Sequence, residues 1–95
     1  MRILYVEDDQ RDADLTRLTL RKIAPQFQME IVSSTGDAHA RLRRLDSEPL
    51  DLVLTDMHLR DGNGLDLLAD IREHSLPLAV VVVTGAGDEE TAVTA

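Results

Sequence analysis

Four short apolar runs along the chain predict four β-strands, at residues 3–6, 27–32, 52–55 and 79–83. Each run is rich in β-branched or other apolar residues and is too short for a typical helix, which favours a strand. The second run alternates apolar and polar side chains, as a strand near the edge of a sheet does. The fourth is almost continuous valine, which is typical of a strand that is buried on both faces.

The stretches between these runs have apolar residues at helical spacing and predict helices at about 10–23, 37–45 and 65–74, with a fourth helix beginning in 88–95. Pro25, Pro49 and Pro77 each separate a helix from the strand that follows it. Alternation of strands and short helices predicts an α/β fold: a doubly wound parallel sheet with helices on both faces. We expect one domain over residues 1–95.

The helical spacing also predicts which side chains face the sheet and which face water. In the first helix, the apolar residues expected to face inward are Leu15, Leu18 and Ile23. In the second helix, the arginines are most simply the solvated side: Arg41, Arg43 and Arg44. His39 and His74 are interpreted as solvated helix positions.

Composition narrows the class of function. The net charge of −8 and a pI of about 4.6 argue against a nucleic-acid surface within this segment. An aromatic content of 2% makes base-stacking platforms improbable. There is no cysteine, hence no disulfide framework and no thiolate metal site, and no run is long enough for a membrane span. We therefore expect a cytoplasmic domain.

Polar groups follow three of the predicted strands at the point where each ends. Glu7, Asp8 and Asp9 follow the first, Asp56 follows the third, and Thr84 follows the fourth. The carboxyl ends of parallel strands share one edge of a sheet, so these groups can converge. Carboxylates brought together repel unless a cation compensates, and oxygen ligands alone select a hard cation such as Mg²⁺. An aspartate in such a setting can form an aspartyl-phosphate intermediate.

Taken together, these stretches resemble the receiver domain of two-component response regulators. The resemblance rests on Ile3–Asp9, on Asp51–Leu59 with the later turn Gly62–Gly64, and on Val81–Gly85. Any one of these alone is a weak signal, but three in the right order and spacing make a strong one. The resemblance implies a flavodoxin-like sheet with strand order 2-1-3-4.

The resemblance also assigns roles to individual residues. Asp56 would be the phospho-acceptor. Asp8 would bind Mg²⁺ directly, Glu7 would do so through water, and the backbone carbonyl of His58 would be a further ligand. Thr84 would bind the phosphoryl group as a switch, with the backbone of Ala86 close to it.

Two departures from the family pattern matter. Arg60 stands where the family usually has proline, which loosens the loop after Asp56 and puts a guanidinium near the site. The family's fifth strand and its phosphate-binding lysine have no counterpart, and the only lysine is Lys22 on the first helix. The domain is thus interpreted as incomplete at its C-terminal end. Without a fifth strand, residues 79–84 would form an open apolar edge through which two chains could associate.

Three functions remain open at this level. The leading hypothesis is a phospho-acceptor switch that takes a phosphoryl group from a histidine kinase or phosphotransfer protein, with no enzyme activity beyond its own phosphorylation and dephosphorylation. The second is a pseudo-receiver, a protein-binding module that is not phosphorylated. The third is a Mg²⁺-dependent phosphatase, which is disfavoured because His58 stands where such enzymes carry a second acid.

Overall fold

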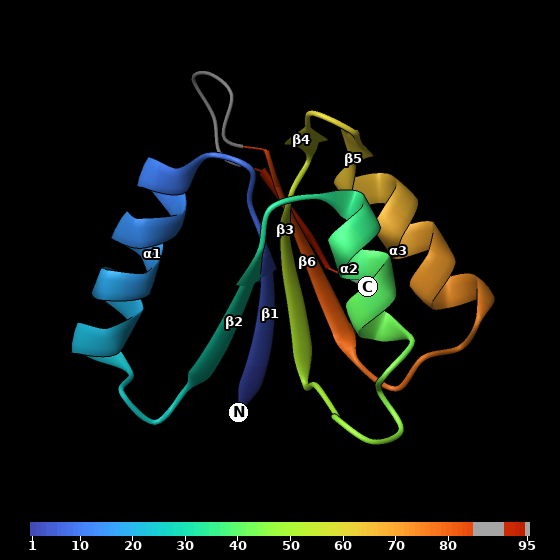
Figure 1. The fold of residues 1–95 in the computed structure, drawn as a ribbon, viewed down its shortest axis with the longest axis horizontal. Helices are drawn as coiled ribbons and strands as arrows, with labels where there is room; N and C mark the ends of the chain where they lie inside the picture. Colours follow the sequence, from blue (N-terminus) through green and yellow to red (C-terminus); the bar gives the residue numbers. More distant parts are fainter. Residues whose placement is uncertain (85–90, 95) are drawn as a thin grey trace.

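A five-stranded sheet forms the centre of the fold in a computed structural model that describes residues 1–84 and 91–94 (Figure 1). Its strand order is β2-β1-β3-β6-β7, in which β1, β2, β3 and β6 run parallel. The strands are β1 (Arg2–Val6), β2 (Gln28–Val32), β3 (Leu52–Asp56), β6 (Ala79–Thr84) and β7 (Thr91–Thr94). The predicted class and parallel order are confirmed, and β2 lies at an edge as its alternating pattern predicts.

Within the described residues, three helices cover the sheet, with α1 on one side and α2 and α3 on the other (Figure 1). They are α1 (Gln10–Ile23), α2 (Thr35–Leu42) and α3 (Gly64–Glu73). Each begins at a residue whose side chain accepts hydrogen bonds from N–H groups of the first turn: Asp9, Ser34 and Asn63. Every helix in the described ranges is too short or too polar to cross a membrane.

The core is aliphatic and lies mainly between the sheet and the pair α2 and α3. Fully buried residues of three neighbouring strands form its centre: Leu4, Val6, Val53, Val80 and Val82. Leu67, Leu68 and Ile71 pack on them from α3 at helical spacing, whereas Leu65 of the same helix is exposed.

The side of helix α1 that packs on the sheet is not the side predicted from its leucines. The prediction that Leu15, Leu18 and Ile23 face inward is wrong, since their side chains are 65%, 54% and 75% exposed. Ala13 is buried instead, and Thr16 and Leu20 are half-buried on the same face. These three residues also follow helical spacing (i, i+3, i+7). Because Ala13 is small and Thr16 carries a hydroxyl, a search for large apolar residues does not detect this face.

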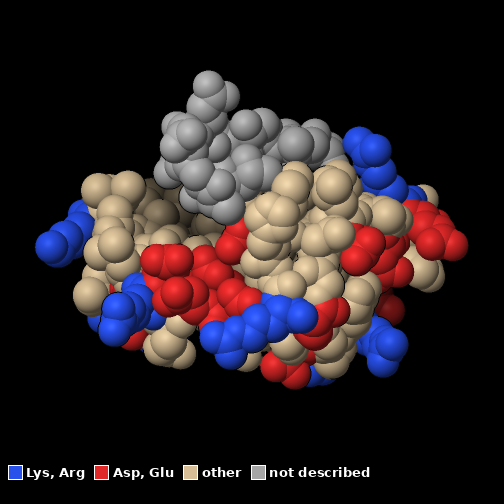
Figure 2. All heavy atoms as spheres, turned by 90° about the horizontal axis from the view of Figure 1, so that it is seen from above, with Lys and Arg blue, Asp and Glu red and all other residues tan. Residues whose placement is uncertain are grey.

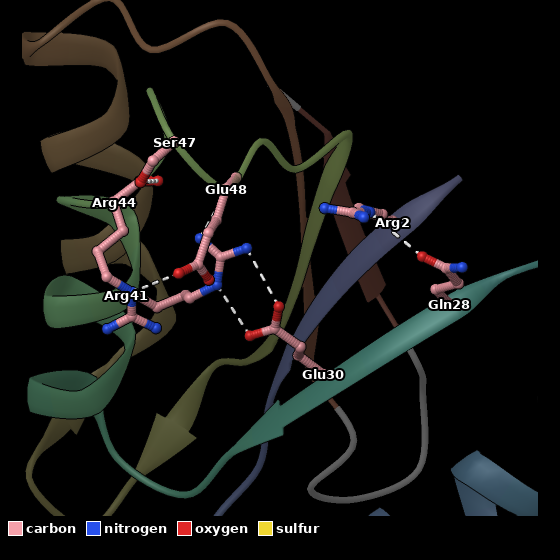
Figure 3. Close-up of polar contacts among 7 residues, drawn as sticks. All are labelled: Arg2, Gln28, Glu30, Arg41, Arg44, Ser47 and Glu48. Carbon is pink, nitrogen blue, oxygen red and sulfur yellow. Dashed lines mark hydrogen bonds and ion pairs between the residues drawn. The ribbon is translucent and has the colours of Figure 1, made fainter.

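Arg41 contradicts the prediction that the arginines of α2 are solvated, because it is only 2% exposed. Its guanidinium donates to both carboxylate oxygens of Glu30 on β2, at 2.8 and 3.1 Å, and to the carbonyl of Glu48 at 2.8 Å (Figure 3). Arg43 and Arg44 are exposed, as predicted. Arg41 therefore joins three segments of the chain: α2, β2 and the loop before β3.

The Glu30–Arg41 pair predicts a contribution to stability that depends on pH. Hydrogen bonding to Arg41 lowers the pKa of Glu30 in the folded chain. The unfolded chain then takes up this proton at a higher pH than the folded chain does. The stabilisation is complete above the ordinary pKa of glutamate and is lost as pH falls through the lowered value. Urea unfolding of the wild type and Glu30→Gln across this acid range should show their stability difference shrinking as pH falls; a constant difference would contradict it.

Strand β7 overturns two further predictions. Residues 91–94 were expected in a fourth helix, but they pair antiparallel with β6, from Val81 opposite Thr94 to Thr84 opposite Thr91. β7 thus covers the outer edge of β6 from Val81 to Thr84, where an open edge for association of two chains was expected. The physical reason is that an unpaired valine-rich strand offers a full row of backbone donors and acceptors. A helix of only a few residues is marginally stable by comparison. Thr91, Val93 and Thr94 are also β-branched, which favours a strand.

Candidate functional site

Three carboxylates converge at the carboxyl edge of the sheet. Glu7 and Asp8 follow β1, and Asp56 ends the neighbouring strand β3. Their ligand oxygens lie within 4.8 Å of one another, and we refer to the three residues as the acidic cluster. Figure 2 looks onto this edge of the molecule and shows a patch of acidic side chains near the middle of the face. The predicted convergence of groups far apart in sequence is thus present.

Glu7 is the buried member of the acidic cluster, with 6% of its surface exposed. Burial raises its pKa, the negative charge of Asp56 adds to the rise, and a hydrogen bond from the Asp9 N–H opposes it. The hydroxyl of Tyr5 donates to Glu7 Oε1 at 3.2 Å. Burial also raises the pKa of Tyr5 to about 12, so that its hydroxyl keeps its proton at neutral pH.

Asp8 is held by the loop that follows β3. The backbone N–H of Arg60 donates to Asp8 Oδ2 at 2.8 Å, and the Arg60 Nε lies 3.9 Å from the same oxygen. A proline has no N–H, so this bond depends on the departure from the family pattern at position 60. The expectation that Arg60 loosens the loop is therefore not met, because its N–H ties the loop to Asp8. The guanidinium is 87% exposed, and the loop is therefore tied to Asp8 mainly through its backbone.

Asp56 sits on a tightly fixed piece of backbone. The N–H of Met57 donates to the carbonyl of Val83 at 2.8 Å, and the N–H of His58 lies 3.4 Å from Asp56 Oδ1. Gly64, the first residue of α3, packs so closely that a Cβ there would lie 2.7 Å from the Asp56 carbonyl oxygen. The first residue of α3 therefore packs directly against the backbone of Asp56 and restricts its movement.

A short hairpin links this site to helix α2. The loop after Asp56 contains β4 (His58–Leu59) paired with β5 (Gly62–Asn63), and Asp61 lies at its tip. Asp61 accepts hydrogen bonds from the N–H groups of Thr35 and Gly36 at 3.0 and 3.2 Å, and the bond from Thr35 does most to lower its pKa. The loop is thus anchored at Asp8 on one side and at the start of α2 on the other.

The donor set of the acidic cluster fits a hard divalent cation. Its three side chains supply carboxylate oxygens and are buried or half-buried. Three negative charges this close are unfavourable unless a cation or a proton compensates. The charge of Asp56 adds to the rise in the pKa of Glu7 that burial causes in the first place. Oxygen ligands without nitrogen or sulfur suit Mg²⁺.

Two predicted site residues cannot be placed as fully as the others. Thr84 ends β6 at the same edge as Asp56, but its side chain and the whole of Ala86 lie outside what the structure describes. Two residues that bear on the site escaped the sequence analysis. Tyr5 could have been found, because residues two apart on a strand share a face and Tyr5 precedes Glu7 by two. The contact of Asp61 with α2 leaves no such signal.

Comparison with known proteins places the sequence in one family. Residues 3–95 match the family model of the response regulator receiver domain. The chain is 34% identical over 92 residues to the response regulator protein PilR of Pseudomonas aeruginosa, covering 97% of this chain and 20% of that protein. It is 37% identical over 93 residues to the photosynthetic apparatus regulatory protein RegA of Rhodobacter capsulatus, covering 98% of this chain and 48% of that protein. The chain thus spans less than half the length of either relative.

Solved structures agree with this match. The MaeR response regulator bound to beryllium trifluoride is 39% identical, with a TM-score of 0.71 over 93% of this chain and 70% of that one. The receiver domain of a Luxo repressor protein from Vibrio parahaemolyticus is 28% identical, with a TM-score of 0.75 over 92% of this chain and 63% of that one.

Proposed function

Since the chain belongs to the family of response regulator receiver domains, signalling domains of two-component systems, we propose that it is a phospho-acceptor switch whose acceptor is Asp56. The observation that carries the proposal is the convergence of Glu7, Asp8 and Asp56 within 4.8 Å at the carboxyl edge of the sheet. The site is half-open to solvent at Asp8 and Asp56, so a phosphoryl donor can reach it. The partner is a histidine kinase or a phosphotransfer protein.

The transfer moves one phosphoryl group between two side chains. A carboxylate oxygen of Asp56 attacks the phosphorus of the partner's phosphohistidine, the new O–P bond forms, and the N–P bond breaks. The leaving imidazole keeps the electron pair of that bond and takes up a proton. Attack by water later cleaves the acyl phosphate and returns Asp56 to its carboxylate.

The other residues neutralise charge and hold position. Asp8 and Asp56 would bind Mg²⁺ directly, Glu7 through water and His58 through its carbonyl, and the ion would supply charge compensation for the phosphoryl oxygens. Arg60 and Asp61 fix the loop that carries the His58 carbonyl. Thr84 and the backbone of Ala86 would bind phosphoryl oxygens.

The proposal predicts a Mg²⁺-dependent gain of one phosphoryl group by the chain on incubation with acetyl phosphate. Intact mass spectrometry measures it directly, since acetyl phosphate replaces an unknown kinase. Asp56→Asn should abolish the gain, because an amide is a poor nucleophile. Asp8→Asn should reduce it by removing a ligand of the ion while leaving the acceptor in place.

Three outcomes separate the alternatives. A gain that survives Asp56→Asn would assign the acceptor to another residue. A wild-type chain that gains nothing, yet is folded by circular dichroism, would favour the protein-binding module. Release of phosphate from small phosphoesters would favour the phosphatase.

A further inference from the structure

Tyr5 is a buried side chain that contacts the acidic cluster from inside the fold. It lies in β1 with 8% of its surface exposed, and its hydroxyl donates to Glu7 Oε1 at 3.2 Å. Side chains alternate along a strand, so Tyr5 lies on the opposite face of the sheet from Leu4 and Val6, which belong to the core beneath α2 and α3. Tyr5 therefore occupies the face of the sheet that α1 covers.

Glu7 is held at both of its carboxylate oxygens. Oε1 accepts the hydrogen bond from the Tyr5 hydroxyl, and Oε2 accepts one from the Asp9 N–H at 3.3 Å. A carboxylate held at one oxygen can still rotate about its terminal bond, whereas one held at both oxygens keeps a single orientation. The two oxygens have about four acceptor positions in all, so each keeps one for a further hydrogen bond. The Glu7 carboxylate is thus fixed and still able to accept.

The Tyr5 hydroxyl is the part of this arrangement that a side-chain substitution can remove. The bond to the other oxygen comes from the backbone of Asp9, which most substitutions leave in place. Glu7 is 6% exposed, so little water is available to replace a lost partner. Because an unpaired buried carboxylate oxygen is unfavourable, the carboxylate would turn toward another donor. Loss of the hydroxyl therefore changes the orientation of Glu7 as well as removing one contact.

We propose that Tyr5 is a positioning residue for Mg²⁺ at the acidic cluster: its hydroxyl holds Glu7 in the orientation in which Glu7 would accept a hydrogen bond from water bound to the ion. Tyr5 acts through Glu7 and is not itself a ligand. The inference rests on the proposed function, because that function assigns Mg²⁺ to the acidic cluster. Partners that orient the groups around a metal typically change its affinity by about 10- to 100-fold. Since Glu7 acts through water, we expect the lower end of this range.

Tyr5→Phe tests this role because it removes the hydroxyl and keeps the ring in place. Mg²⁺ titration followed by the backbone amide NMR signals of residues 7–9 measures the affinity without any phosphorylation step. Tyr5→Phe should weaken Mg²⁺ binding about tenfold. Ile3→Val is the matched control, since Ile3 is 5% exposed on the same face of β1 and the change shortens a buried side chain away from Glu7. It should bind Mg²⁺ as the wild type does, and circular dichroism establishes that both variants are folded.

Two further measurements show whether Tyr5 acts through Glu7. Glu7→Gln should itself weaken Mg²⁺ binding, and adding Tyr5→Phe to it should cause little further loss, since substitutions at the two ends of one hydrogen bond are not additive. Tyr5 is the only tyrosine of the chain, which has no tryptophan, so the fluorescence of the wild type reports on this ring. The fluorescence should change over the same Mg²⁺ concentrations as the NMR signals.

The possible failures are distinguishable from one another. Equal Mg²⁺ affinity of the wild type and Tyr5→Phe overturns the role of Tyr5 and leaves the Mg²⁺ site standing. An equal loss of affinity in Ile3→Val, or a full further loss when Tyr5→Phe is added to Glu7→Gln, overturns it as well, because the effect would then not pass through Glu7. A folded wild type that binds no Mg²⁺ overturns the proposed Mg²⁺ site together with the role of Tyr5.

Discussion

Replacing Gly64 with alanine is expected to lower the free energy of unfolding by about 1–3 kcal/mol, the usual cost of forcing an extra methyl into a packed site. A Cβ at this position would lie 2.7 Å from the Asp56 carbonyl oxygen, 2.9 Å from Thr55 Cγ2 and 3.1 Å from Val82 Cγ1. A backbone oxygen and two buried β-branched side chains cannot move aside as a flexible side chain could. Either α3 shifts outward or the end of β3 does, and both changes displace Asp56.

Gly36→Ala is the matched control, because a Cβ there would meet only Ser34 Oγ at 3.9 Å and an Asp61 oxygen at 4.0 Å. Gly36 lies in the first turn of α2, so alanine should stabilise the chain there by about 0.5–1 kcal/mol. Urea unfolding of both variants measures the difference. Gly64→Ala should also slow phosphorylation by acetyl phosphate under conditions where it remains folded. Equal stabilities of the two variants would contradict the close packing of α3 on Asp56.

Replacing Arg41 with alanine is expected to cost about 2–4 kcal/mol of unfolding free energy, in the range for removing a large buried side chain. The guanidinium and its aliphatic stem are almost fully buried, and the carbonyl of Glu48 would lose its partner. We place the value below the full cost of breaking a buried ion pair, because Glu30 is 49% exposed and water can solvate it.

Arg44→Ala is the control for charge and residue type. Arg44 pairs with Glu48 at 3.6 Å, but both side chains are about half exposed, so its loss should change stability by less than about 0.5 kcal/mol. Denaturant unfolding at neutral pH should rank the variants with Arg41→Ala least stable and Arg44→Ala close to wild type. Similar effects of the two substitutions would mean that Arg41 is solvated in solution.

The sequence alone was enough to predict most of what places the acidic cluster. Apolar runs of strand length followed at once by Glu7–Asp9 and by Asp56 predicted both the parallel sheet and the edge where the carboxylates meet. This works because strand ends and the carboxyl edge of a parallel sheet are local and topological features. The roles of Asp8, Asp56 and His58 in binding Mg²⁺ and the phosphoryl group remain predictions.

Only the tertiary structure decided which polar groups are buried and which apolar groups are not. Arg41 lies three residues after Ala38 on the inward face of α2, unlike Arg43 and Arg44, which follow the end of the helix. Its charge can be buried there because Glu30 and the Glu48 carbonyl, on other segments, lie within its reach. Leu15 and Leu18 are exposed because α1 lays its Ala13 side on the sheet. The partners of His39 and Asp61 lie 31 and 26 residues away along the chain.

Strand β7 likewise depends on both local sequence and a tertiary contact. Residues 91–94 carry enough β-branched side chains to pair, but their choice between a helix and a strand depended on whether the edge of β6 was available. Local pattern thus determined the strands, most of the helices and the acidic edge of this protein. Contacts between distant segments, which no local pattern encodes, decided the burial of charge, the face that α1 turns to the sheet and the contact of His39 with Asp70.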